Sequence, residues 1–213
     1  MPETKFSQLA EVFERLEKTA SSLAMIDILA DFFPKIFPEE AKISAYLLRG
    51  ELAPAYEDLE IGLADKMVIR AIAKSENIEI EKIKPLFNKT GDLGLVIENL
   101  KSCEANPRKN PRKDYGLAIK EVFEKLIEIA KIGGEGSQEK KINLLADLFS
   151  KTSGLEAKYI IRTILGTLRL GVGEMTFLQG LAKAFGAGKK DKETLEYAFN
   201  ILSDLSPSII SGY

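Results

Sequence analysis

The sequence predicts an all-α protein with about ten to twelve helices, arranged in two related halves that share one core. Three observations support this prediction. Apolar residues recur at steps of three and four along nearly the whole chain, no stretch alternates with period two for long enough to form a strand, and the two halves align with each other. With 213 residues, 45% of them hydrophobic, the chain can bury one substantial core.

The helices are predicted from apolar spacing and from residues that start or stop helices. The first helix has one apolar face, formed by Phe6, Leu9, Phe13 and Leu16. Ser21 caps a second helix that Pro34 ends, and Pro38 begins a third that runs to about Gly50. Further helices are expected at residues 63–75, 80–89, 92–101, 117–131, 138–149, 155–166, 174–185 and 192–204.

The two halves of the chain align with each other, and the first 26 positions of the alignment need no gap. Residues 27–52 align with 143–168 at an offset of 116, with 10 identities over 26 positions, where roughly two are expected from ordinary composition. The offset then falls to 109, because the first half carries seven extra residues near 53–60. Two copies are too few for a solenoid. We therefore expect a single domain with pseudo-two-fold symmetry, whose halves are residues 1–101 and 117–213 and whose connection is 102–116.

Composition excludes several classes of function. The net charge is −2, so any anion site must be a local patch. The chain has no histidine and a single cysteine, Cys103, which excludes His-based catalytic triads, an internal disulfide and a Cys-cluster zinc site. There is no apolar run near 18 residues. We expect a reduced, intracellular and soluble protein that has no membrane partner.

A glycine turn in the second half is the first candidate binding element. Gly171 and Gly173 lead into a helix, where they let a ligand approach the backbone closely and where unpaired N–H groups form a seat for a phosphate. Arg169 stands just upstream as a cationic partner, and Thr176 lies in the first turn of the helix. The alternative is a tight helix–helix turn in which a glycine serves as a C-cap.

The repeat supplies a counterpart to this turn. Gly62 aligns with Gly171, and Gly62, Ala64 and Lys66 again open a helix. Two pseudo-equivalent helix N-termini could each hold the phosphates of one strand of a duplex, whose strands are themselves related by two-fold axes. Backbone amides, small residues and lysines read charge and shape rather than base identity.

A third element follows the glycine-rich segment 133–136. Ser137 is predicted to cap a helix whose first turn holds Lys140 and Lys141. Cations at this end oppose the helix dipole, so two lysines are explained if an external anion binds there. The alternative is that the two lysines only keep the surface solvated.

Signals for independent catalysis are missing. Residues 186–190 lack the upstream glycine and the Ser/Thr of a P-loop, and no Asp-Gly dipeptide occurs, which excludes an EF-hand loop and a Lys-x-Asp-Gly nucleotidyl-transfer motif in this chain. The carboxylates fall mainly on solvated helix faces. We predict no catalytic residue, no metal site and no cofactor within the chain, and an independent enzyme is the least supported class.

Four segments together resemble a known family. LAPAYEDLEIGLADKMVIRAIA (52–73), TGDLGLVIENL (90–100), GEGSQEKKINLLADLF (134–149) and GTLRLGVGE (166–174) are similar to the N-terminal DNA-binding domain of ATP-dependent DNA ligases of the archaeal and eukaryotic type. The resemblance runs in order along nearly the whole chain.

The resemblance implies an all-helical, pseudo-two-fold domain that grips nicked double-stranded DNA across the minor groove. It implies DNA contacts at Arg169, Gly171 and Gly173, at Gly62 and Ala64, and at Gly136, Ser137, Lys140 and Lys141. The parent reaction would be that of a DNA ligase (ATP), EC 6.5.1.1, which uses ATP and Mg²⁺ to seal 3′-OH/5′-phosphate nicks in replication, repair and recombination.

The chain departs from the family pattern in two respects. The Lys-x-Asp-Gly adenylation motif and the OB-fold domain are absent, and the chain ends at Tyr213 soon after its last expected helix, so we expect an excised domain that is inactive alone. Some archaeal members carry a sliding-clamp motif with paired aromatics, but residues 100–104 here lack them. The alternative function is a helical protein-interaction module, such as an adaptor for a replication factor or a sliding clamp, with exposed apolar or aromatic anchors.

Overall fold

The computed structural model describes residues 3–53, 59, 61–102 and 115–186. In these residues the chain is all-α, as predicted, and it contains no strand beyond one isolated bridge between Lys5 and Ala118. The elements are α1 (Phe6–Glu17), α2 (Ser22–Phe32), the 3₁₀ turn η1 (Phe33–Lys35), α3 (Pro38–Arg49), α4 (Asp65–Glu76), α5 (Ile80–Thr90), α6 (Leu93–Lys101), α7 (Ile119–Lys131), α8 (Ser137–Ser150), α9 (Gly154–Ile164) and α10 (Glu174–Gly186).

Local signals explain where several helices begin and end. The Ser21 side chain accepts a hydrogen bond from the amide of Ala24 at the start of α2, and Ser153 does the same for Glu156 at the start of α9. Helix α3 starts with Pro38 at its first position and ends at Gly50, which is left-handed. The sequence places these four boundaries within a residue or two.

Two sequence predictions about helix starts are wrong in detail. Helix α4 begins at Asp65 rather than at residue 63, because Gly62 has a positive φ and Ala64 is the extended N-cap. Ser137 does not cap α8, since the N-cap is Gly136, with φ 72° and no side-chain cap bond. The predicted helix at 192–204 and most of the 102–116 connection lie outside the described residues.

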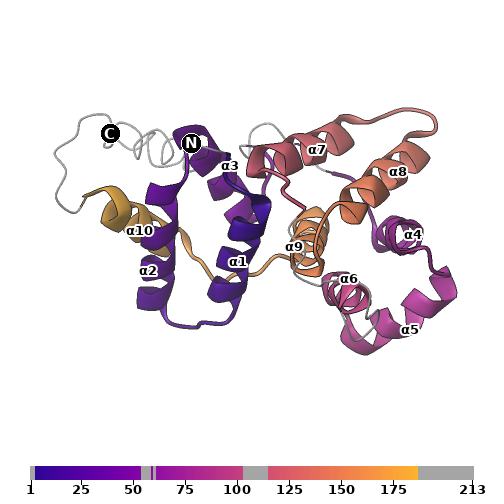
Figure 1. The fold of residues 1–213 in the computed structure, drawn as a ribbon, viewed down its shortest axis with the longest axis horizontal. Helices are drawn as coiled ribbons and strands as arrows, with labels where there is room; N and C mark the ends of the chain where they lie inside the picture. Colours follow the sequence, from indigo (N-terminus) through magenta and orange to yellow (C-terminus); the bar gives the residue numbers. More distant parts are fainter. Residues whose placement is uncertain (1–2, 54–58, 60, 103–114, 187–213) are drawn as a thin grey trace.

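Figure 1 shows two lobes, and helices from both halves of the sequence contribute to each. Helices α1, α2 and α3 form one lobe together with α10, while α7, α8 and α9 lie with α4, α5 and α6 in the other. Helix α10 packs on α2, and α4 packs on α8. The fourth helix of each half therefore crosses over to the opposite lobe.

Corresponding positions in the two lobes make corresponding contacts. The Lys183 amine lies 2.6 Å from the Asp27 carboxylate between α10 and α2. The Lys74 amine lies 2.6 Å from the Asn143 side-chain oxygen between α4 and α8. These two pairs occupy matching positions under the offsets of 116 and 109 read from the sequence.

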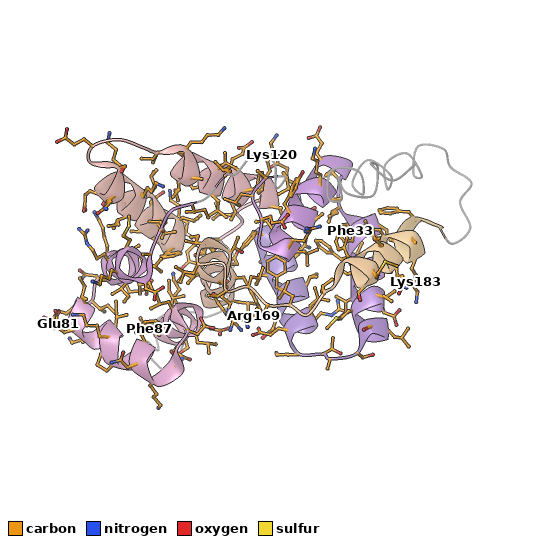
Figure 2. The ribbon with its side chains drawn as sticks, turned by 180° about the vertical axis from the view of Figure 1, so that it is seen from behind. Phe33, Glu81, Phe87, Lys120, Arg169 and Lys183 are labelled. Atoms are coloured by element: carbon orange, nitrogen blue, oxygen red, sulfur yellow. The ribbon has the colours of Figure 1, made fainter. Side chains whose placement is uncertain are left out.

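The N-terminal ends of α1 and α7 lie side by side where the lobes join. The Phe6 amide donates to the Leu117 carbonyl at 2.8 Å, and the Ile119 amide donates to the Thr4 carbonyl at 2.9 Å. One continuous core of buried aliphatic and aromatic side chains runs through both lobes. At one end of that core, Phe33 (labelled in Figure 2) contacts Phe177 of α10 edge to face, with ring centroids 5.6 Å apart.

Candidate nucleic-acid interface

The first glycine turn, residues 61–64, leads directly into α4. Gly62 has φ +61°, a conformation that disfavours side chains, and Ala64 caps the helix without a side-chain bond. The amides at the start of α4 are therefore not satisfied by a capping side chain. The turn lines an open cavity of about 660 Å³ together with residues 50–53 and with residues 163–166 at the end of α9.

The second glycine turn, residues 170–173, leads into α10 in the same way. Gly171 has φ +70°, and the turn lines a cavity of about 570 Å³ with Arg49, Glu51 and Arg169. Arg169 is exposed and makes no ion pair or hydrogen bond with any residue that the structure describes. None of the described residues that line the first cavity is basic, so the two turns differ in charge over this part of the chain.

The two cavities are neighbours. Glu51 lines both of them, and the Cβ position of Gly50 would lie 3.6 Å from the Cβ of Leu168. Figure 2 shows Arg169 near the middle of the molecule, where the two lobes meet. The structure therefore brings the Gly62 and Gly171 turns to adjoining parts of the surface.

Within this junction the charge of Glu51 is compensated. The Arg49 guanidinium lies 3.2 Å from the Glu51 carboxylate, and both side chains are about a third exposed. An anion that approached the second cavity would meet this pair and the unpaired guanidinium of Arg169. The local field therefore favours an anion, although the whole chain has a net charge of −2.

The third predicted element, the start of α8, holds two lysines in different environments. Lys140 is exposed and has no partner among the described residues. Lys141 is buried, and its Nζ donates to the Ile61 carbonyl oxygen at 2.6 Å. This bond connects the start of α8 to the Gly62 turn. Nearby, Glu139 forms an exposed ion pair with Arg70 of α4 at 2.6 Å.

Besides Lys141, which bonds to the Gly62 turn, five of the predicted site residues line neither cavity: Lys66, Gly136, Ser137, Lys140 and Thr176. Lys66 and Lys140 are exposed cations in the first turns of α4 and α8, and Thr176 is half-buried in the first turn of α10. The structure therefore places Gly62, Lys141 and the second turn close to the junction, and it places these five at helix starts around it.

The sequence reasoning missed Arg49, Gly50, Glu51 and Gly166, which all line a cavity. The repeat contained a usable signal, because Gly50 aligns with Gly166 and both have a positive φ. Both glycines line the first cavity.

A charged network fixes α9 beneath the first cavity. Arg162, one residue before the cavity lining, lies 2.6 Å from Glu17 of α1 and 2.7 Å from Asp92 at the start of α6. The Tyr159 hydroxyl donates to Glu17 at 2.7 Å, and the Lys158 amine lies 3.0 Å from the same carboxylate. The network ties the end of α9 to both lobes.

The same contacts shift the ionisation of Glu17 and Tyr159. Partial burial opposes ionisation of Glu17, but hydrogen bonds from Tyr159, Arg162 and Lys158 outweigh it and lower its pKa to about 2. Burial, together with the hydrogen bond to ionised Glu17, raises the pKa of the Tyr159 hydroxyl. Glu17 therefore stays negatively charged at neutral pH.

The described residues contain neither a metal-binding cluster nor a membrane-spanning helix. No group of three or more histidine, cysteine, aspartate or glutamate side chains converges there in a way that could hold a metal ion. No helix in that part of the chain combines the length and the apolar character needed to cross a bilayer.

Comparison with known proteins identifies the family. A family model described as DNA ligase N terminus matches residues 5–182. DNA ligase 2 of Thermofilum pendens is 39% identical over 204 residues, which cover 94% of this chain and 34% of that protein. The DNA ligase of Pyrobaculum islandicum is 38% identical over 207 residues, covering 94% of this chain and 34% of that protein.

A third relative matches a similar share of both chains. A probable DNA ligase of Dictyoglomus thermophilum is 41% identical over 200 residues, which cover 94% of this chain and 33% of that protein. The chain thus spans about a third of the length of the curated relatives that it matches. The family match over most of its residues confirms the resemblance read from the sequence, and the chain belongs to the DNA ligase N-terminal family.

Proposed function

We propose that this chain binds double-stranded DNA without reading its sequence, across the minor groove at nicks. The observation that carries the proposal is the pair of glycine turns at Gly62 and Gly171. Each turn leads into a helix N-terminus, and the cavities that the two turns line share Glu51. Family membership supports a role in a DNA ligase.

The chemistry of these turns suits phosphate groups. Helix N-termini carry unpaired N–H groups and a partial positive charge, which favour anions. Arg169 adds a guanidinium that has no partner among the described residues at the second turn, and Lys66 and Lys140 add exposed ammonium groups at the starts of α4 and α8. Backbone amides and lysines contact phosphates and carry no base information, which explains binding that is independent of sequence.

The internal repeat supports a two-sided grip. Helices α4 and α10 occupy matching positions and pack on the matching helices α8 and α2. A pseudo-two-fold axis between the halves would let each glycine turn meet one strand of the duplex. Lys141 connects the start of α8 to the first of these turns.

The whole protein would be an ATP-dependent DNA ligase that uses ATP and Mg²⁺ to seal 3′-OH/5′-phosphate nicks in replication, repair and recombination. The chain described above would be silent in that reaction and would hold the duplex, raising the effective concentration of the catalytic part at the nick. It would act as a monomer in the cytoplasm, associated with the nucleoid. A sliding clamp is a further proposed partner of the whole protein.

The alternative, a protein-interaction module, finds less support on the described surface. The large exposed apolar side chains there come from separate elements: Leu23, Phe37, Leu86, Tyr115 and Met175. A docking site for a partner protein usually gathers such residues into one patch.

Salt-dependent binding tests the proposal. The chain should bind a fluorescently labelled nicked duplex with a Kd on the order of 10⁻⁴–10⁻⁶ M, and log K should fall linearly with log salt. Lys140→Glu combined with Arg169→Glu should weaken binding to unrelated sequences alike and should reduce the salt slope by about two, since each lost phosphate contact removes about 0.9.

Lys120→Glu is the matched control for this experiment. Lys120 lies on α7, is exposed and has no partner among the described residues, and Figure 2 shows it at the upper edge of the molecule, away from Arg169 near the middle. Its substitution should leave the slope unchanged. Equal losses in the control and in the double variant, or no detectable binding by the unmodified chain at low salt, would contradict the proposal.

A further inference from the structure

Lys140 and Lys141 are adjacent lysines at the start of α8, but their side chains lie in different environments. Lys140 is exposed and has no partner among the described residues. Lys141 is 8% exposed, and its amine is directed to the Ile61 carbonyl. A phosphate on the surface of this face can reach the first amine more easily than the second.

The Lys141 amine supports the Gly62 turn from beneath. Its Nζ donates to the Ile61 carbonyl oxygen at 2.6 Å, across 80 residues of sequence. A Cβ built on Gly62 would lie 3.5 Å from the same Nζ, so a side chain at this position would touch the amine. A short hydrogen bond from an ammonium to a carbonyl in a buried setting is strong, because little water competes for either group.

The second half of the chain uses the same position with different chemistry. Met25 aligns with Lys141, and Gly171 aligns with Gly62. A Cβ built on Gly171 would lie 3.2 Å from the Cε of Met25. Each glycine turn therefore rests on a long, unbranched side chain from the first turns of the helix beneath it, and in one of the two cases that side chain carries no charge.

We propose that Lys141 is a positioning residue, whose buried amine holds the Gly62 turn in the shape that receives DNA, and that it contacts no phosphate itself. This inference rests on the proposed function. The two lysines then have different roles. Lys140 contributes positive charge to the interface, and Lys141 holds the conformation of the Gly62 turn. The requirement at position 141 is then a side chain that reaches the turn and donates a hydrogen bond to the Ile61 carbonyl, rather than a charge that meets a phosphate.

Three variants separate the two roles through the salt dependence of binding. Lys141→Met introduces the residue found beneath the other turn but removes the hydrogen bond to Ile61, so it should keep the salt slope of the unmodified chain while its Kd rises less than that of Lys141→Ala. Lys141→Ala removes the support, and its Kd should rise about tenfold at every salt concentration, which corresponds to roughly 1.4 kcal/mol, with the slope unchanged. Lys140→Met should reduce the slope by about 0.9.

Two outcomes would overturn the inference. A slope reduced in Lys141→Met as much as in Lys140→Met would mean that the amine leaves Ile61 and contacts phosphate when DNA binds. A Kd and slope in Lys141→Ala that equal those of the unmodified chain would mean that the turn needs no support from this position. All titrations belong well below the unfolding temperature of each variant, so that loss of fold does not imitate loss of affinity.

Hydrogen exchange tests the support without DNA. In Lys141→Ala the amides of residues 61–64 should exchange faster than in the unmodified chain, whereas Lys140→Met should leave them unchanged. Faster exchange together with no DNA binding by any variant or by the unmodified chain would refute the proposed function and leave the structural role of Lys141 intact. Unchanged exchange in Lys141→Ala would refute the positioning role whatever the DNA result.

Discussion

Single residues at the junction differ in how much room the fold leaves around them. A Cβ on Gly171 would lie 3.2 Å from Met25, and the residue has a positive φ, so a side chain there strains the protein itself. A Cβ on Gly173 meets no heavy atom within 4 Å, and its φ lies outside the left-handed region. Gly173 is therefore the position at which a side chain tests the approach of a ligand rather than the fold.

The corresponding prediction is that Gly173→Val keeps its folded stability and loses DNA affinity. The valine would occupy space that the DNA backbone needs, and we expect the Kd to rise about tenfold, or roughly 1.4 kcal/mol. Thermal unfolding and fluorescence anisotropy measure the two effects. Gly133→Val, another open position outside the predicted site, is the control. A wild-type Kd for Gly173→Val would show that the turn is structural alone.

At the scale of elements, the crossing of α10 onto α2 depends on close contact. A Cβ on Gly180 would lie 2.8 Å from the Cβ of Leu29 and 3.0 Å from its Cδ1, and the side chain of Leu29 is fully buried. The glycine lets the two helices approach closely at this crossing. This packing carries α10, and with it the Gly171 turn, to the lobe opposite α4.

We predict that Gly180→Ala lowers the free energy of unfolding by about 1–3 kcal/mol through overpacking. The sign of this change distinguishes overpacking from helix propensity, because helix propensity alone would make the alanine variant more stable by about 1 kcal/mol. Urea denaturation measures the change. Leu29→Ala should lose less stability in the Gly180→Ala background than in the unmodified chain, since it removes the Cδ1 that would lie 3.0 Å from the new methyl group and leaves only the Cβ contact. Purely additive losses would argue against this contact.

At the scale of the whole molecule, the network around Glu17 joins the lobes. It connects α1 to α9 and, through Arg162 and Asp92, to the start of α6. The pKa of Glu17 is about 2 in the folded protein and 4.5 in the ordinary reference state. Because folding lowers this pKa, the stabilisation is fully present above about pH 4.5 and disappears as the pH falls toward 2.

Glu17→Gln should therefore destabilise the protein by about 2 kcal/mol at neutral pH, the order expected for hydrogen bonds to a charged group. The difference between the variant and the unmodified chain should shrink as the pH falls from 4.5 to 2. Denaturation at a series of pH values measures it. Asp31→Asn, which removes an exposed pair with Lys35, should change stability little at any pH. A stability difference between Glu17→Gln and the unmodified chain that stays constant down to pH 2 would contradict the lowered pKa of Glu17.

Local patterns were sufficient for much of this structure. Periodic apolar residues predict the helices, and Ser21, Pro38 and Gly50 mark boundaries, because helix formation and capping depend on neighbours along the chain. The two glycine turns could also be located, since an internal repeat exposes matched positions without any contact information. The error at Ser137 arose where Gly136, in a left-handed conformation, took the N-cap position instead.

What the amino-acid order determined by itself is thus the all-α class, the family, and the pair of turns that open helices. The tertiary structure alone decided that Lys141 is buried while Lys140 is exposed, and that Glu17 meets Arg162 across 145 residues. It also decided that α10 packs on α2 in the opposite lobe. The physical reason is that burial and ion pairing depend on which distant surfaces come together. Lys140 and Lys141 are equivalent in the sequence, and only the folded chain brings the Ile61 carbonyl to one of them.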